Sequence, residues 1–275
     1  MKAYPALEIR AADPDRLYAA IDDFSPTALE ERTDSIRVFF STTSARDNAQ
    51  SALAPKFQVA AIDVPDEDWA RRSQADLQPV TVGRLTICPR GTASPQPLAP
   101  SPDVIVITPS MGFGTGHHAT TRLCLAALQT LELSHLSVLD VGTGSGVLAI
   151  AADRLGAASA LGIDHDQDAV QAARENLALN PTARRVSFAV ADLRTTPLPR
   201  AGVVTANLTG ALLIETAADL LGAVEDGGTL IVSGLLAGER EEVVEALTGG
   251  QYVQHQRIVW EREEDGWVGL AVKKT

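Results

Sequence analysis

The chain has 275 residues and a mass of 29.0 kDa, which allows one or two domains with a sizeable core and excludes a small disulfide-held scaffold. With 45% hydrophobic and 21% charged residues, its composition is that of an ordinary globular protein. It has 23 Lys and Arg against 35 Asp and Glu, a formal charge of -12. This charge disfavours direct binding to nucleic acid or to anionic membranes and is compatible with a basic protein partner.

Cysteine spacing and apolar runs restrict the compartment and the metal chemistry. Cys88 and Cys124 are the only cysteines, without CxxC spacing or a histidine cluster, so neither a disulfide framework nor a metal site is expected. The first residues form no apolar leader, and no apolar run approaches the roughly 20 residues of a membrane span. We therefore expect a cytoplasmic protein. A monomer is the oligomeric state that we expect.

The first 65 residues alternate short strand-like and helical patterns. Strand-like runs are expected at 6–9, 36–40 and 57–64, a less regular one at 28–32, and helices at 14–21 and 45–53. This order is typical of a small α+β domain with ferredoxin-like βαββαβ topology. We predict a separate domain over residues 1–65.

Residues 66–102 have the composition of a connector. Five prolines fall between positions 89 and 102, and repeated proline disfavours regular strand pairing. The stretch from Val80 to Cys88 is the exception, because it is strand-like. The connector is therefore expected to be only partly structured.

From residue 103 onward strands and helices alternate. Strands are expected at 104–107, 138–141, 160–163, 186–190, 203–206 and 229–232, with helices at 121–131, 147–155, 167–179 and 212–221. Two further strand-like runs, 252–262 and 267–273, leave little room for a helix and predict a closing antiparallel hairpin. The pattern indicates an α/β domain over residues 103–275, with a mostly parallel Rossmann-like sheet covered by helices on both faces.

The strongest local pattern is an apolar strand that runs into Gly142, Gly144 and Gly146. Glycine lets a backbone approach a ligand closely, and Val147 occupies the place of the third glycine of the dinucleotide fingerprint, which argues against NAD or FAD. Asp164 follows the next strand, where a carboxylate can accept both hydroxyls of a ribose. These features predict a nucleoside site; a tight turn followed by a helix-capping Asp is the alternative.

The stretch from Leu139 to Gly146, together with Asp164, resembles the first motif and the ribose-binding acid of class I methyltransferases. The resemblance implies S-adenosylmethionine as the cofactor, with Gly142 and Gly144 beside it. Asp192 follows the third strand, where such enzymes often hold the adenine amino group. A loop cap is the alternative role for Asp192.

A second glycine-rich loop, residues 111–121, precedes a predicted helix and could close over a cofactor. It resembles the loop of the methyltransferases that modify large-subunit ribosomal protein eleven, through Phe113, Gly114, Thr115, Gly116, His118, Thr120 and Thr121. In that family the loop contacts the methionine and sulfonium parts of the cofactor, which implies such contacts for Thr115 and Thr121. Phe113 is also expected to bind the cofactor. The alternative is a turn and a helix cap. Adjacent His117 and His118 lack a carboxylate cluster, so structural or solvent-facing roles are expected for both.

Asn207 ends another apolar strand, at the same predicted sheet edge as Gly142 and Asp164. An amide oxygen there can accept hydrogen bonds from an amine and aim its lone pair at a methyl carbon, which makes Asn207 the candidate catalytic residue. The alternative is a turn former. The family has a matching Asn, usually with Pro five residues later, where this chain has Leu212.

Taken together, the resemblance extends from about Asp66 to the C-terminus and implies a protein methyltransferase. Its implied targets are α-amino and lysine ε-amino groups of large-subunit ribosomal protein eleven, recognised by residues 1–65. One alternative is a related enzyme that methylates lysines of another protein or a small amine. Another is a non-catalytic adaptor that binds S-adenosylmethionine.

Overall fold

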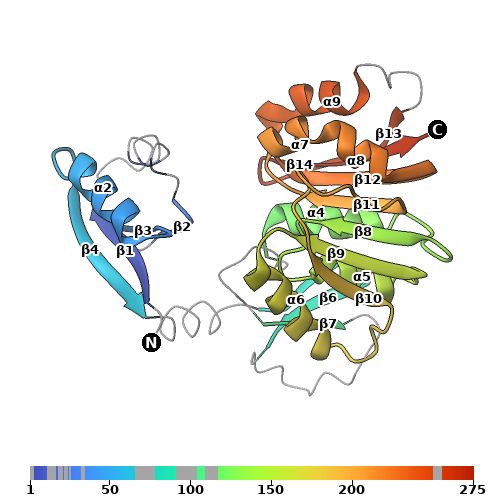
Figure 1. Cartoon of the computed structure of the whole chain (residues 1–275), viewed down its shortest axis with the longest axis horizontal. Helices are drawn as coiled ribbons and strands as arrows, with labels where there is room; N and C mark the ends of the chain where they lie inside the picture. Colours follow the sequence, from blue (N-terminus) through green and yellow to red (C-terminus); the bar gives the residue numbers. More distant parts are fainter. Residues whose placement is uncertain are drawn as a thin grey trace. The chain divides into compact units, whose positions relative to one another are not determined.

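The computed structural model describes residues 3–10, 17, 21, 24, 26–31, 35–65, 78–90, 104–108, 117–249 and 256–275 (Figure 1). The chain divides into two compact units, Met1–Ala75 and Asp76–Thr275. Within the described ranges no helix has the length and apolar character needed to cross a membrane.

The first unit is a four-stranded antiparallel sheet with a helix packed on it. Its elements are β1 (Ala3–Arg10), β2 (Ala28–Glu31), β3 (Ile36–Phe39), α2 (Thr43–Leu53) and β4 (Gln58–Pro65). The strand order β2-β3-β1-β4 confirms the predicted ferredoxin-like topology. Leu7, Ile9, Val38 and Leu53 are buried together in its core. Of the helix predicted at 14–21, only residues 17 and 21 lie within the described ranges.

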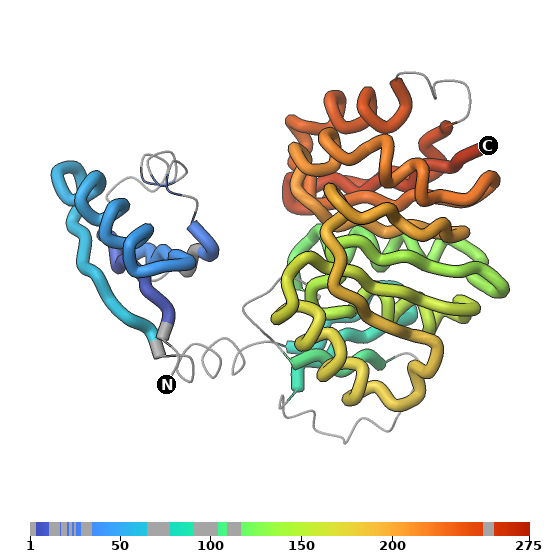
Figure 2. The backbone as a smooth tube through the Cα atoms, in the orientation of Figure 1, coloured from blue at the N-terminus to red at the C-terminus, as the bar shows by residue number. Residues whose placement is uncertain are grey.

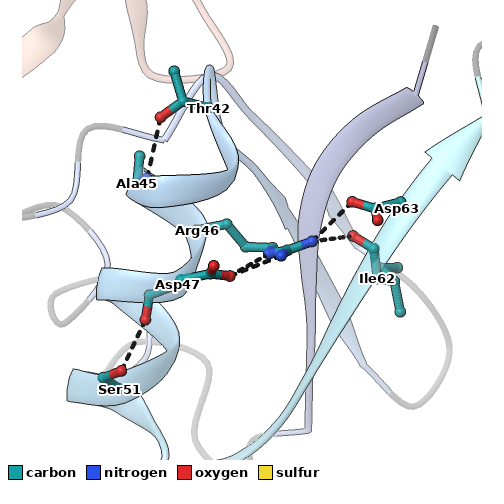
Figure 3. Close-up of polar contacts among 7 residues, drawn as sticks. All are labelled: Thr42, Ala45, Arg46, Asp47, Ser51, Ile62 and Asp63. Atoms are coloured by element: carbon teal, nitrogen blue, oxygen red, sulfur yellow. Dashed lines mark hydrogen bonds and ion pairs between the residues drawn. The ribbon is translucent and has the colours of Figure 1, made fainter.

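Polar contacts fix the start of α2 and its position against β4 (Figure 3). The Thr42 hydroxyl accepts a hydrogen bond from the Ala45 N–H at 3.1 Å, which caps the first turn. Arg46 reaches from the helix to β4, where its Nη1 donates to Asp63 Oδ1 at 2.8 Å. The helix is therefore tied to a strand at the edge of the sheet.

The second unit is built on a seven-stranded sheet in the order β10-β9-β8-β11-β12-β14-β13. The strands are β8 (Ser137–Val141), β9 (Ser159–Asp164), β10 (Val186–Val190), β11 (Ala201–Asn207), β12 (Val224–Leu236), β13 (Gln256–Glu264) and β14 (Trp267–Lys274). The pairs from β10 to β12 are parallel, and β14 is antiparallel to both its neighbours. Figure 2 shows the tube of β11 beside that of β8, where Val203 pairs with Val138. The predicted Rossmann-like sheet and its closing hairpin are confirmed.

Helices cover both faces of this sheet. They are α4 (Ala119–Leu128), α5 (Val147–Arg154), α6 (Gln167–Ala178), α7 (Gly210–Glu215), α8 (Ala217–Ala223) and α9 (Arg240–Thr248), with a 3-10 turn η2 (Ala237–Glu239) before α9. Val138 and Val203 pack with α4, α5 and α6 on one side, which we call the α4 face. Leu139 and Val204 pack with α7, α8 and α9 on the other, the α7 face. Alternate strand residues thus serve two separate cores.

One strand lies in a different sheet from the one that the alternating pattern predicts. Strand β7 (Val104–Ile107) pairs in parallel with β6 (Leu85–Pro89), which in turn pairs with β5 (Val80–Val82), and these three form a separate sheet. Ile87 and Ile105 of this small sheet are buried in the core of the α4 face. The run from 80 to 88 is two strands rather than one because the chain turns at Gly83, whose φ is +57°.

Two helical features also differ from the sequence prediction. The helix predicted at 212–221 is interrupted at Thr216, where α7 ends and α8 begins, and the Thr216 hydroxyl donates to the Leu212 carbonyl at 2.7 Å. Helix α9 was not predicted. It buries Val243 and Leu247, whose four-residue spacing among glutamates was the available signal.

Candidate active site

A pocket of about 420 Å³ opens at the edge of the seven-stranded sheet where the parallel strands end. Five of the eight residues predicted to bind the cofactor line it: Gly142, Gly144, Asp164, Asp192 and Asn207. They follow or end β8, β9, β10 and β11, and parallel strands place their carboxyl ends at one edge. The fold thus gathers residues that are up to 65 positions apart into a cavity of the size that binds small molecules.

Three other predicted residues are not among those that line this pocket. Phe113 and Thr115 lie outside the described residues. Thr121 is buried in the first turn of α4, while its neighbour Thr120 lines the pocket. The Thr121 hydroxyl has no hydrogen-bond partner within the part of the chain that the structure describes. An unpaired buried hydroxyl costs about 1–3 kcal/mol, so an additional partner is expected at this position.

The loop from Gly142 to Gly146, which we call the glycine loop, is shaped by close packing. A Cβ atom on Gly142 would lie 2.6 Å from Leu208 Cδ2, and one on Gly146 would lie 2.7 Å from Phe188 Cζ. Both glycines have positive φ, +72° and +81°. Since the N–H groups of Gly142 and Thr143 both donate to the Ile163 carbonyl at 2.9 Å, the loop is anchored to β9.

Asp164 joins the end of β9 to the glycine loop. Its Oδ2 accepts a hydrogen bond from the Gly144 N–H at 3.0 Å, and its Oδ1 accepts one from the Asp166 N–H at 3.1 Å. The side chain is 11% exposed and lines the pocket. His165 Nδ1 also lies 3.3 Å from Oδ1. Because a carboxylate has about four lone-pair sites, Asp164 can still accept a hydrogen bond from a ligand hydroxyl.

Asp192 combines the two roles that the sequence left open. Its Oδ1 accepts the Arg194 N–H at 2.9 Å, as a loop cap does, and the residue also lines the pocket. That backbone hydrogen bond lowers the pKa of Asp192 below its ordinary value, and the Arg194 guanidinium adds to the effect. Asp192 is therefore ionised at neutral pH and can accept a hydrogen bond from an amino group.

Comparison with known proteins places the chain in a family. The family model described as Ribosomal protein L11 methyltransferase (PrmA) matches residues 13–275. The chain belongs to this family. A Ribosomal protein L11 methyltransferase of Pseudomonas paraeruginosa is 40% identical over 77% of this chain and 69% of its own length. One of Geobacter sulfurreducens is 43% identical over 82% of this chain and 79% of its own length.

A solved structure supports the same membership. The crystal structure of ribosomal protein L11 methylase from Lactobacillus delbrueckii subsp. bulgaricus matches with a TM-score of 0.64 and 28% identity, covering 72% of this chain and 100% of that one. The protein is therefore an S-adenosylmethionine-dependent protein methyltransferase.

In this methyltransferase a buried carboxylate that the sequence did not single out lies beneath the glycine loop. The hydroxyls of Thr143 and Thr205 donate to separate oxygens of Asp140, each at 2.6 Å. Burial raises the pKa of Asp140 to about 6, although the two hydroxyls oppose the shift. The signal in the sequence was an Asp within an otherwise apolar strand. Asp140 ties β8 to both β11 and the glycine loop.

A histidine and a tryptophan complete one wall of the methyltransferase pocket. His118 Nδ1 lies 2.8 Å from the Thr120 hydroxyl and 3.4 Å from the Thr120 nitrogen, so it caps α4. The ring meets Trp267 edge-on, with centroids 4.9 Å apart. Burial, followed by the charge of Arg122, lowers the pKa of His118. His118 is therefore a neutral structural residue of the pocket wall. Trp267 was missed because it starts a strand far away in the sequence.

Arg122 holds this wall together. Its Nε donates to Glu264 Oε1 at 2.6 Å and its Nη2 to Asp265 Oδ2 at 2.8 Å, and Nη1 donates to the His117 carbonyl. His117 also contacts the Gln78 carbonyl through Nε2 at 2.8 Å. The start of α4 is thereby tied to the turn between β13 and β14 that precedes Trp267.

The residues present fit S-adenosylmethionine. Asp164 offers remaining lone-pair sites on its carboxylate for ribose hydroxyls, and the glycine loop allows a ligand to approach the backbone. Thr121 leaves a buried hydroxyl without a partner among the described residues. Acidic side chains also suit a ligand with a positively charged sulfur.

Proposed function

We propose that this methyltransferase transfers methyl groups to α-amino and lysine ε-amino groups of ribosomal protein L11. The observation that carries the proposal is the convergence of Gly142, Asp164 and Asn207 on one pocket, in a chain of this family. The three residues end or follow three neighbouring strands, so a nucleoside site and a candidate amine site share one cavity.

Each pocket residue has a distinct role in this proposal. Asp164 holds the ribose, Asp192 the adenine amino group, and the glycine loop lies against the cofactor. When bound, S-adenosylmethionine supplies a methyl group that its sulfonium activates for attack by a nucleophile. The Asn207 side-chain oxygen accepts a hydrogen bond from the substrate amine and so orients the nitrogen lone pair.

Only a neutral amine has a lone pair with which to attack. An α-amine has a reference pKa of about 7.7–8.0 and is partly neutral at pH 7, whereas lysine, near 10.4, must lose a proton first. Leu208, Leu212 and Trp267 line the pocket with apolar surface, which favours the neutral amine by desolvation. Alignment by such a pocket supplies up to roughly 7–11 kcal/mol of catalysis.

The proposed roles are assigned to the two domains and the connector with the bounds predicted from the sequence. Residues 1–65 recognise the ribosomal protein, residues 66–102 connect, and residues 103–275 carry out methyl transfer. The net charge of -12 supports a basic substrate, since complementary charge raises the encounter rate. We propose that the enzyme acts as a monomer in the cytoplasm, where such a substrate is made.

The test is a methyl-transfer assay with purified L11 and the full chain, read by mass spectrometry of the intact protein and its peptides. We expect added mass in multiples of a methylene group at the N-terminus and at lysines. An unmodified L11, together with methylation of another protein or of a small amine, would discard the proposed substrate. Cofactor binding without turnover on any of these would instead indicate an adaptor.

A further inference from the structure

Two buried asparagines lie beside the edge of the small sheet. One belongs to α6 and the other to the turn that follows it. Asn176 and Asn180 are each 1% exposed and lie four residues apart, hence on one side of the chain. Strand β7 is at the edge of its three-stranded sheet, with β6 on its other side. The asparagine amides supply hydrogen-bond partners to the backbone of β7 that a further strand would otherwise supply.

The two asparagines share one kind of contact and differ in another. Asn180 Oδ1 accepts from the Val106 N–H at 3.0 Å, and its Nδ2 donates to the Val106 carbonyl at 2.8 Å. Asn176 Oδ1 accepts from the Thr108 N–H at 2.8 Å, but its Nδ2 donates to the Ser145 carbonyl at 2.9 Å. Asn180 therefore binds β7 through both its amide oxygen and its amide nitrogen. Asn176 instead bridges the residue after β7 and the glycine loop.

We infer that Asn176 is a positioning residue for cofactor binding, because its amide holds the glycine loop in place against Thr108. The inference rests on the proposed function, in which the glycine loop lies against S-adenosylmethionine. The residue does not line the pocket. It acts through the backbone of Ser145, which is itself 2% exposed.

The geometry shows how the loop depends on this bridge. Two nearby backbone groups of the loop are held from two sides, with the Gly144 N–H donating to Asp164 and the Ser145 carbonyl accepting from Asn176. Without the second bond the buried Ser145 carbonyl loses the Asn176 donor, and the loop is free to rotate toward another arrangement. Rotation there moves the Gly144 N–H away from the carboxylate that is proposed to bind the ribose.

Helix α6 is also too close to the loop to move independently of it. A Cβ atom on Gly146 would lie 3.0 Å from the Cβ of Ala173, one turn before Asn176. A shift of the loop is therefore transmitted to α6, and through Asn176 to Thr108. By linkage, a ligand that stabilises the loop also stabilises the hydrogen bond of Thr108.

The chain offers a closely matched pair of variants. Asn176→Asp keeps the acceptor for the Thr108 N–H and Asn180→Asp keeps the acceptor for the Val106 N–H. Each variant removes an Nδ2 donor and places a carboxyl at an equally buried position, and Asn180→Asp also removes the donation to the Asn176 carbonyl. Only Asn176→Asp removes a bond to the glycine loop. Affinity for S-adenosylhomocysteine is measured by calorimetry on the full chain, and melting temperature by scanning calorimetry.

We expect both variants to melt at lower temperature and Asn176→Asp alone to bind S-adenosylhomocysteine at least tenfold more weakly. Equal affinity of Asn176→Asp and wild type, or equal weakening in both variants, would overturn the inference while leaving the proposed function intact. Wild-type protein that binds no S-adenosylhomocysteine would overturn both.

A second measurement uses only the wild-type protein, so it does not depend on whether a variant folds. In the wild type, S-adenosylhomocysteine is expected to slow hydrogen exchange of the Thr108 amide severalfold, with the Val82 amide of the same small sheet as the internal control. Exchange at Thr108 that is unchanged by the ligand, in protein that calorimetry shows to be saturated, would overturn the coupling between Asn176 and the pocket.

Discussion

The two faces of the seven-stranded sheet differ in how they are held together. The α7 face is packed with aliphatic side chains such as Val204, Leu220 and Leu230. The α4 face also has an apolar core, but buried polar side chains are added to it: Thr120, Thr121, Asp140, Thr143, Ser145, Asn176, Asn180 and Thr205. Among the described residues, all of these polar groups except the Thr121 hydroxyl bond to each other, to the His118 ring or to the backbone.

Because of this difference, substitutions that change stability and substitutions that change binding should fall on different faces of the sheet. Apolar packing is non-directional and tolerates small displacements, whereas hydrogen bonds between buried groups define a geometry and cost free energy when a partner is lost. The alternation of β11 explains the asymmetry, because Val203, Thr205 and Asn207 point to the α4 face and Val204 and Ala206 to the other. Substitutions in the apolar core of the α7 face, away from the pocket, should therefore change stability, and those of the polar groups on the α4 face should change binding or pH dependence.

The largest stability loss is expected on the α7 face. Leu220→Ala removes a fully buried side chain of α8, which should lower the free energy of unfolding by about 2–5 kcal/mol. Affinity of the folded protein for S-adenosylhomocysteine should not change. Urea unfolding and calorimetry measure the two quantities. Ile214→Ala, at a 37% exposed position of α7, is the control and should cost far less.

Asp140→Asn should alter the pH dependence of stability. The Asp140 carboxyl binds its proton more tightly in the folded protein than in the unfolded chain. Protonated Asp140 therefore stabilises the folded state fully below the unfolded pKa, and this stabilisation is lost as pH rises through about 6. Since the variant lacks this titration, its stability relative to wild type should rise by roughly 2 kcal/mol between pH 4 and pH 7. Urea unfolding at several pH values tests this, and parallel curves for the two proteins would contradict it.

Asp164→Ala should act on binding. The loss of a charge-assisted hydrogen-bond site should weaken cofactor affinity by about 1–3 kcal/mol. Titration calorimetry with S-adenosylhomocysteine measures the change. Asp226→Ala is the control, since that acid is mostly exposed and pairs with Arg200 and Lys274 away from the pocket. Unchanged affinity of Asp164→Ala would exclude the ribose role.

Asn207→Ala should lower turnover and leave folding nearly intact. An orienting hydrogen bond of about 1–2 kcal/mol corresponds to a loss of roughly tenfold in turnover. Steady-state methyl transfer and a thermal melt distinguish the two effects. Normal turnover with a much lower melting temperature would identify Asn207 as a turn former only.

The smallest effect is expected at the surface of the α7 face. Arg240 donates to both oxygens of Glu261, at 2.6 and 2.8 Å, and both side chains are about a third exposed. Exposed ion pairs contribute about 0.2–1 kcal/mol, and salt screens them. Arg240→Ala should thus lower the melting temperature slightly at low salt and less at high salt. A change in cofactor affinity would contradict the proposal that substitutions on the α7 face change stability and not binding.

Much of the fold could be predicted because strand and helix periods are local. The strands from β8 to β12 follow from apolar runs, and α5 and α6 from apolar spacing after a glycine loop or an acidic cap. The assignment of β7 could not be predicted this way, because pairing with β6 depends on contacts between distant segments. Helix α9 was missed because its apolar signal is only two residues among charges.

The site could be predicted in part for the same reason. Gly142, Asp164 and Asn207 are each recognisable at the end of an apolar strand, and parallel strands bring such ends together. Trp267 comes from an antiparallel strand at the far end of the chain, and Asn176 from the buried side of a helix. A Trp at the start of a strand and an Asn on a helix are both ordinary, so neither residue could be recognised from the sequence.

The sequence by itself determined the alternation of elements, the glycine loop and the polar residues at strand ends, since these depend on spacing along the chain. The tertiary structure alone decided which buried groups are paired, namely Asp140 with two threonines, His118 with Trp267, and Asn176 with both β7 and the glycine loop. The physical reason is that a hydrogen bond or a ring contact depends on ångström distances between segments, which no local pattern encodes.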